Sequence, residues 1–277
     1  MLRFKRVKVA PSDAREPYLH ALRDFYIKRD FPNGLSYEEL TPMLCFDYWK
    51  LKPKQQRTIW DNCDWIAQEK INGIRVVVHF VRGVGVFAHS RVTSARTFRR
   101  IELTEHLLFT NFVPNFTATI DTEVSCGKDE ANLQRTAALL RKTPKDSKHF
   151  QKEHNIPLVA YVFDITNWQG ADLKQKRLCE RLSYLPDFRA AISNAQLSLY
   201  FEFPPIFFQG KRAIFNKITA ERGEGIVLKN LNSSYKNSSS RCRYSWVKVK
   251  RQMEMDGYVS GFERGRPGSN WETKPSF

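Results

Sequence analysis

The sequence contains no apolar run approaching the ~20 residues that a membrane-spanning helix needs. Its first residues, Met1 to Arg6, lack the apolar core of a signal peptide. The five cysteines stand singly, without the paired spacing of a zinc site or the even count of a disulfide framework. No internal repeat is visible. These absences predict a soluble intracellular protein in a reducing compartment, with no membrane association.

Acidic residues are also scarce. The chain has 29 Asp and Glu against 45 Lys and Arg, a formal charge of +16. A surplus of this size favours a polyanionic partner, and nucleic acid is the first candidate, although a merely soluble basic protein is the alternative. Basic residues gather in short clusters. The candidates for contact with nucleic acid are Arg96, Arg99, Arg100 and Lys142.

At 277 residues, 42% of them hydrophobic, the chain is long enough for one large domain with a small or incomplete appendage. Helical patterns occur from Pro17, from Ser36, over 132–140 and over 172–185. Patterns typical of strands dominate from Trp65 onward. They cover 65–70, 74–81, 84–89, 117–124, 158–164, 199–203, 225–229, 245–250 and 256–262. Strands interrupted by a few helices, without regular βαβ alternation, predict an α+β fold of mainly antiparallel sheets.

One lysine stands between a predicted strand and a predicted turn. Lys70 follows the strand that begins at Trp65, and Asn72-Gly73 is a dipeptide typical of sharp turns. A lysine attacks an electrophile only when uncharged, so burial or a nearby cation such as Arg75 would have to lower its pKa. The pattern is compatible with a nucleophile and also with a solvated hairpin lysine.

Acidic and aromatic residues follow at strand positions. Asp121 and Glu123 are two apart on an alternating strand, so their side chains share one face. Phe163 ends a strand, where its ring could stack on a base, and Glu224 lies between two glycines. Taken alone, each segment also fits an ordinary polar strand face or core packing.

Three lysines complete the series. Lys229 ends the apolar strand that follows Glu224, and Lys248 and Lys250 project from one face of a later strand. Two ammonium groups on one strand face repel each other unless an anion lies between them. A triphosphate would supply that anion.

In this order, the motifs resemble those of the covalent nucleotidyltransferase superfamily, and most closely the ATP-dependent DNA ligases. The resemblance covers about residues 42 to 262, including a short segment, Pro42-Met43-Leu44, before the nucleotide pocket. It rests on the segments Glu69 to Arg75, Ser90-Arg91, Asp121 to Glu123, Phe163-Asp164, Glu224 to Lys229 and Trp246 to Lys250.

The resemblance implies an α+β nucleotidyltransferase (ATP-grasp-like) domain of mainly antiparallel sheets flanked by helices. It implies a monomer that uses ATP and Mg²⁺ to seal nicked duplex DNA during replication, repair or recombination. The compartment would be the cytoplasm or nucleoid of a prokaryote or virus-infected cell, or a nucleus. The implied roles are adenylation for Lys70; nucleotide binding for Gln68, Arg75, Arg91, Glu123, Phe163, Lys229, Lys248 and Lys250; and metal binding for Glu123 and Glu224.

The sequence departs from the family pattern at two places. Asn72 stands where the family usually has aspartate, so one charge beside Lys70 is lost. The chain continues only to residue 277 after the lysine strand, which is too short for a complete OB-fold domain. The expected organisation is an N-terminal helical segment packed on the core over 1–60, the adenylation domain over 61–252, and a truncated OB-fold stub over 253–277.

Other functions remain open from the sequence. An RNA ligase or an mRNA-capping guanylyltransferase would use the same lysine, glutamates and lysine strand. A nucleic-acid-binding relative that has kept the fold with a weakened reaction is the alternative from a different class.

Overall fold

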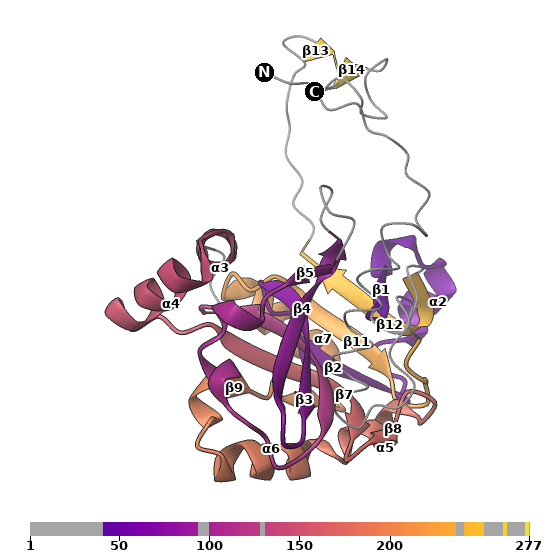
Figure 1. Cartoon of the computed structure of the whole chain (residues 1–277). Helices are drawn as coiled ribbons and strands as arrows, with labels where there is room; N and C mark the ends of the chain where they lie inside the picture. The colour runs from indigo at the N-terminus through magenta and orange to yellow at the C-terminus, as the bar shows by residue number, and fades with distance from the viewer. Residues whose placement is uncertain are drawn as a thin grey trace.

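The computed structural model describes residues 41–93, 100–127, 131–236, 241–251, 263–264 and 275–276 (Figure 1). Most of the described strands form two sheets. The strands are β1 Leu44–Asp47, β2 Trp65–Glu69, β3 Ile74–Val81, β4 Gly85–Thr93, β5 Arg100–Glu102, β6 Ala118–Ser125, β7 Val159–Trp168, β8 Ala171–Asp172, β9 Phe201–Glu202, β10 Ile206–Phe207, β11 Gly225–Asn230, β12 Arg241–Lys250, β13 Glu263–Arg264 and β14 Pro275–Ser276.

The five-stranded sheet has the order β1-β12-β11-β2-β10. Its pairs are antiparallel except β1 with β12, which is parallel. The alternation of β12 decides which of its faces is buried. Val247 and Val249 are 0% and 1% exposed in an apolar cluster, while Lys248 and Lys250 lie on the other face. The strand therefore carries its lysines toward the space between the sheets.

The seven-stranded sheet has the order β5-β4-β3-β6-β7-β8, with β9 pairing in parallel with β7. The apolar run of β3 is buried, and Val76, Val78 and Phe80 enter the larger hydrophobic core. β3 and β6 pair antiparallel with Arg75 opposite Glu123. This register brings the two segments that the sequence marked as functional side by side.

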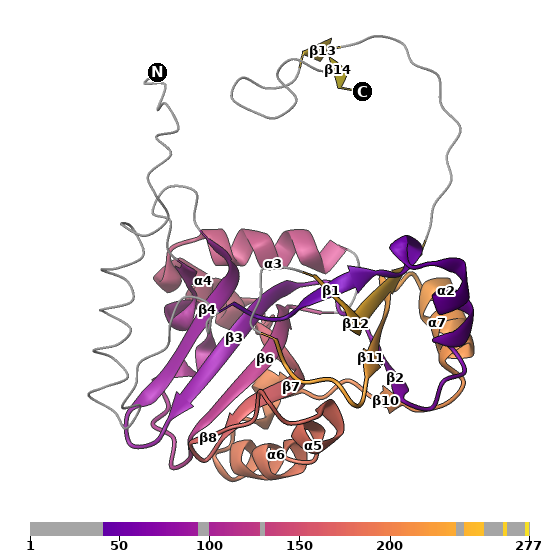
Figure 2. The same cartoon turned by 90° about the vertical axis from the view of Figure 1, so that its right-hand side faces the viewer.

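Helices cover the outer faces of the sheets (Figure 2). The ring centre of Phe188, on α6, lies 5.5 Å from that of Phe80. Phe215, on α7, packs against Trp60 in the apolar cluster of the five-stranded sheet. The helices are α2 Pro53–Thr58, α3 Ala131–Arg141, α4 Pro144–Glu153, α5 Leu178–Leu182, α6 Leu185–Asn194 and α7 Lys211–Ala220, with 3₁₀ turns η1 Tyr48–Lys50, η2 Thr104–His106, η3 Leu108–Asn111 and η4 Ser198–Tyr200. Among the described segments, no helix is long and apolar enough to cross a membrane.

The mixed α+β class with mainly antiparallel sheets is confirmed, as are the long strands and the helix near 132–140. The single helix predicted over 172–185 is wrong: the stretch contains the end of β8, a turn and α5, and α6 starts at Leu185. Leu173 and Leu178 are both fully buried, but residues five apart do not lie on one face of a helix. A helical spacing is kept only by Leu178, Leu182 and Leu185.

Several predicted elements lie outside the described residues. They are the helices from Pro17 and Ser36 and the strand over 256–262. In the described part of the first sixty residues, β1 joins the five-stranded sheet and Trp60 packs in its apolar cluster. The division into 1–60, 61–252 and 253–277 stays a prediction.

Candidate nucleotide site

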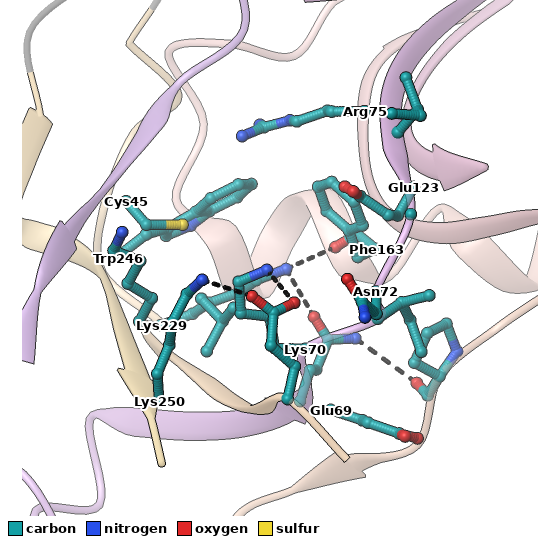
Figure 3. Close-up of a pocket in the computed structure, with 18 of the residues that line it drawn as sticks. Cys45, Glu69, Lys70, Asn72, Arg75, Glu123, Phe163, Lys229, Trp246 and Lys250 are labelled. Carbon is teal, nitrogen blue, oxygen red and sulfur yellow. Dashed lines mark hydrogen bonds and ion pairs between the residues drawn. The ribbon is translucent and has the colours of Figure 1, made fainter. Parts of the chain in front are cut away.

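A pocket of about 420 Å³ lies between the two sheets. Its size is within the range of small-molecule sites, ~300–1,000 Å³. Every residue for which the sequence implied a catalytic, nucleotide-binding or metal-binding role lines it: Gln68, Lys70, Arg75, Arg91, Glu123, Phe163, Glu224, Lys229, Lys248 and Lys250. Figure 3 labels Lys70, Arg75, Glu123, Phe163, Lys229 and Lys250 among them. Their assembly from seven strands and two loops is a property of the tertiary structure.

Lys70 is held at the mouth of this pocket by a carboxylate. Its backbone N–H donates to the Gly225 carbonyl (2.9 Å), and its Nζ donates to Glu224 Oε2 (2.6 Å). The second oxygen of Glu224 pairs with Lys250 Nζ at 2.5 Å. Partial burial acts to raise the pKa of Glu224, but the two ammonium groups overcome it and hold that pKa below its ordinary value. One carboxylate thus neutralises two lysines.

The turn after Lys70 is anchored to β6. A Cβ on Gly73 would approach the Val124 carbonyl oxygen to 2.4 Å, so a larger residue would displace the turn. Ser125 Oγ donates to the Asn72 carbonyl (3.1 Å), and the Asn72 side chain faces the pocket. Close backbone approach therefore explains the glycine, and the asparagine sits beside the lysine, as the sequence suggested.

Arg75 is fixed by a chain of buried polar groups. Its guanidinium pairs with both oxygens of Asp121, Nε at 2.9 Å and Nη2 at 2.5 Å. The Tyr235 hydroxyl donates a hydrogen bond to Asp121 Oδ2 (2.5 Å) and accepts one from the backbone N–H of Met43 (3.2 Å). Bidentate pairing restrains the arginine strongly. The guanidinium carbon lies 5.2 Å from the ring centre of Phe163.

Glu123 is the unusual acid of the site. Burial raises its pKa to about 7, and Lys70 and Arg75 only partly oppose this effect. Within the described residues, no group of three or more acidic, histidine or cysteine side chains is placed to hold a metal ion. Mg²⁺ is commonly bound through one or two carboxylates together with substrate phosphates, and Glu123 with Glu224 fits that habit.

Replacing Glu123 with glutamine is expected to stabilise the nucleotide-free protein above pH 7. The folded state holds the Glu123 proton up to about pH 7, whereas the ordinary value is 4.5, so the wild-type free energy of unfolding falls as pH rises through this window. Since Glu123 is partly exposed, the full shift is discounted and we expect a gain of roughly 2 kcal/mol at pH 8 and almost none at pH 4.5.

Urea unfolding of both proteins across this pH range measures the difference. Glu105→Gln is the matched control, because the Glu105 side chain is 72% exposed and pairs with Lys148 only at 3.9 Å. Parallel pH profiles for wild type and Glu123→Gln would contradict the assignment.

The inner end of the pocket holds a buried cation. Lys229, 2% exposed, donates from Nζ to Gln68 Oε1 (2.5 Å) and to the Phe163 carbonyl (3.0 Å). The same Nζ lies 4.6 Å from the ring centre of Phe163 and 4.3 Å from that of Trp246. The resemblance implied nucleotide binding for Lys229, and the structure places its ammonium group among an amide, a carbonyl and two aromatic rings.

Lys248 and Lys250 share one face of β12, as predicted from the alternation. Each pairs with a different carboxylate: Lys248 Nζ lies 3.8 Å from Asp47 Oδ2, and Lys250 pairs with Glu224, which it shares with Lys70. Arg91, on β4, lines the same pocket. These cations surround the pocket mouth.

Of the four residues predicted to contact DNA, the structure describes the side chain of Lys142 alone. Arg96 and Arg99 lie outside the described residues, and only the backbone of Arg100 is described, at the start of β5. Lys142 follows α3 away from the pocket lining, with its Nζ 5.6 Å from the ring centre of Phe150. Their role remains a prediction.

Sequence reasoning missed several residues of the site. Cys45, Pro204 and Trp246 form part of the pocket wall, and Tyr235 supports Arg75 through Asp121. Tyr235 stands in a stretch rich in Asn and Ser, which is typical of a loop and does not mark a site residue. Trp246 directly precedes the lysine strand positions, but no local pattern distinguishes a pocket aromatic from a core aromatic.

Comparison with known proteins settles the family. A family model described as the ATP dependent DNA ligase domain matches residues 42–250, which is most of the chain. This chain belongs to the ATP-dependent DNA ligase domain family. The resemblance inferred from the motifs is therefore confirmed.

A curated relative of this ligase-family chain is DNA ligase 4 of Saccharomyces cerevisiae, 25% identical over 237 residues. The alignment covers 77% of this chain but 23% of the yeast protein. The chain therefore spans less than a quarter of the length of that relative.

Two solved structures confirm the ligase fold. Mycobacterial DNA ligase D complexed with ATP and MES matches with a TM-score of 0.54 and 18% identity, covering 78% of this chain and 62% of that one. The ATP-dependent DNA ligase from bacteriophage T7, in complex with ATP, matches with a TM-score of 0.53 and 15% identity, covering 86% and 76%. At these identities the likeness concerns the fold.

Proposed function

We propose that this chain transfers AMP from ATP to Lys70 and then to the 5′-phosphate of nicked duplex DNA, which is sealed when the neighbouring 3′-hydroxyl displaces AMP. The observation that carries the proposal is the position of Lys70 in the 420 Å³ pocket, with Glu224 and Lys250 at one end and Gln68 with Phe163 at the other. The pocket therefore has a cationic mouth suited to phosphates and an aromatic end suited to a base.

In the proposed first step, the lone pair of Lys70 Nζ forms a P–N bond to the α-phosphorus while the bond to the pyrophosphate oxygen breaks. Nζ gives up a proton to solvent beforehand, which frees the lone pair that attacks. Glu224 holds Nζ at 2.6 Å and pairs with Lys250 through its other oxygen, so it must release Lys70 before Nζ can turn toward the α-phosphorus. We infer that nucleotide binding brings about this release.

The remaining residues position and neutralise the nucleotide in this proposal. Phe163 stacks on the base, and Arg75, held by Asp121, contacts the ribose. Lys248 and Lys250 neutralise phosphate charge that develops during transfer. When bound, Mg²⁺ would neutralise charge on the departing pyrophosphate, with Glu123 and Glu224 as its protein ligands.

The domain organisation inferred from the sequence belongs to the same proposal. Residues 61–252 would form the adenylation domain and 253–277 the beginning of an OB-fold domain. Binding of nicked DNA would use the cationic pocket mouth with Arg91, and the basic cluster at Arg96, Arg99, Arg100 and Lys142. The protein would act as a monomer.

The test is to incubate the full chain with labelled ATP or GTP and Mg²⁺, and then to chase with nicked DNA, nicked RNA or intact duplex. Label from ATP that moves to nicked DNA, with sealing, supports the proposal. Preference for GTP would indicate a capping enzyme, and sealing confined to RNA would indicate an RNA ligase. Binding of nicked duplex without covalent label, compared at matched ionic strength because phosphate contacts depend on salt, would indicate a relative without the reaction.

A further inference from the structure

The inner wall of the pocket contains two buried polar side chains that depend on each other. Gln68 on β2 and Lys229 on β11 are each 2% exposed, and their strands are neighbours in the five-stranded sheet. Lys229 Nζ donates to Gln68 Oε1 at 2.5 Å, and no carboxylate of the described residues forms an ion pair with this lysine. An ammonium group in such surroundings is costly to bury, so its hydrogen bonds matter.

The lysine determines which way the glutamine amide faces. An ammonium group only donates hydrogen bonds, so the amide atom in front of it must be the oxygen. The amide nitrogen then points away, toward the Pro204 carbonyl at 3.5 Å. Rotating the amide by a half turn would place its NH₂ against the ammonium group, donor against donor. Gln68 is therefore locked in one of its two orientations.

A locked amide presents a fixed pattern to a base that stacks on Phe163. Its oxygen has a second lone pair for an amino donor, and its nitrogen has a hydrogen for a ring acceptor. Adenine offers that pair, an exocyclic amino group beside a ring nitrogen, and glutamine reads adenine in this bidentate manner. Guanine offers a carbonyl oxygen at the same place, which would meet the amide oxygen. A freely rotating amide would accept either base.

We propose that Lys229 is the residue that makes the pocket select adenine over guanine, by locking the Gln68 amide, and that it is not a phosphate ligand. This inference rests on the proposed nucleotide-binding function of the same pocket. The two bases differ in whether their six-position group donates or accepts. A site whose buried polar groups would be left mismatched rejects the wrong substrate strongly.

The expected result for Lys229→Met is a fall in the ATP-to-GTP preference of about tenfold to a hundredfold. The change should come mainly from more efficient labelling by GTP, with a smaller loss of labelling by ATP. Lys248→Met is the comparator: a lysine at the phosphate end should lower labelling by both nucleotides by the same factor. If Lys229→Met also lowers both equally, Lys229 is a phosphate ligand and the inference is wrong.

A double-mutant cycle tests whether Lys229 acts through Gln68. In a Gln68→Ala background, Lys229→Met should leave the ATP-to-GTP preference unchanged, because no amide remains to be locked. An additional fall of tenfold or more in that background would show that the lysine contacts the base directly and would overturn the mechanism.

Two measurements keep the inference testable if a variant does not fold or if wild type forms no covalent intermediate. Wild type should reject inosine triphosphate as strongly as GTP, because the two share the six-position carbonyl and differ only in the two-amino group. Use of inosine triphosphate at the ATP level would refute the inference. Thermal shifts of the wild-type protein with ATP, GTP and inosine triphosphate report the same preference without any reaction, so a failure of the ligase proposal is distinguishable from a failure of base selection.

Discussion

Replacing Lys70 with alanine should abolish covalent labelling by ATP, with no residual label above the level of a heat-denatured sample. In the pocket, Lys70 Nζ lies 2.6 Å from Glu224 Oε2, and its backbone N–H donates a hydrogen bond to the Gly225 carbonyl at the start of β11. Loss of a covalent nucleophile removes the reaction path itself, which is the largest effect a single substitution can have.

Lys70→Arg separates nucleophilicity from charge. Arginine keeps a cation that can pair with Glu224, but its guanidinium does not lose its proton at neutral pH, so it cannot attack phosphorus. ATP binding, followed by thermal shift, should survive in Lys70→Arg while covalent labelling is lost. Lys217→Ala, on the exposed face of α7, is the control and should label as wild type does. Stoichiometric label on Lys70→Ala would refute the assignment.

Of the substitutions proposed here, the replacement of Arg181 should lower the free energy of unfolding the most. Arg181 and Asp164 are both completely buried and form a bidentate pair, with Nε–Oδ1 at 3.0 Å and Nη2–Oδ2 at 2.8 Å. Arg181 Nη1 also donates to the carbonyls of Lys176 (2.7 Å) and Ser233 (3.0 Å). Arg181→Met leaves the Asp164 charge buried without its partner, and the free energy of unfolding should fall by about 3–5 kcal/mol.

The residue that precedes α5, the helix that carries Arg181, supplies the control. Arg177 pairs with Glu180 at 3.0 Å on the solvent side, where water screens the interaction, so Arg177→Met should leave the urea midpoint unchanged. The double variant Arg181→Met with Asp164→Leu should recover part of the loss, since neither charge is then left alone. A loss below 1 kcal/mol in Arg181→Met would contradict the structural role.

The Arg181 variant should also weaken ATP binding. Ser233, which Arg181 holds, is two residues before Tyr235, whose hydroxyl supports Asp121 and through it Arg75. Loosening this segment therefore frees the arginine that lines the pocket. Comparing ATP-induced thermal shifts for Arg181→Met and Arg177→Met separates this effect from general destabilisation.

Much of the site was accessible from local patterns. The alternation around Lys248 and Lys250 predicts a strand with lysines on one face, and Asn72-Gly73 predicts the turn after Lys70, because both patterns depend on neighbouring residues and on backbone geometry. The order of motifs along the chain then predicted the family.

Local patterns failed where distant parts of the chain decide the outcome. The leucines over 172–185 suggested one helix, but Leu173 is buried in the larger core beside β7 and only the later leucines follow a helix. β1 was not predicted, because its four residues become a strand by pairing with β12, about two hundred positions later. Short strands receive their hydrogen bonds from partners, and no pattern within four residues encodes the partner.

Lys70 with its turn, the lysine strand and the ordered acids are determined by the sequence itself, since side-chain alternation and turn geometry are local. The tertiary structure alone decided that Glu224 lies between Lys70 and Lys250, that Tyr235 reaches Asp121, and that Lys229 faces Gln68 rather than the lysines at the pocket mouth. These contacts join strands far apart in sequence. Their strength depends on burial, which arises only when the two sheets close around the pocket.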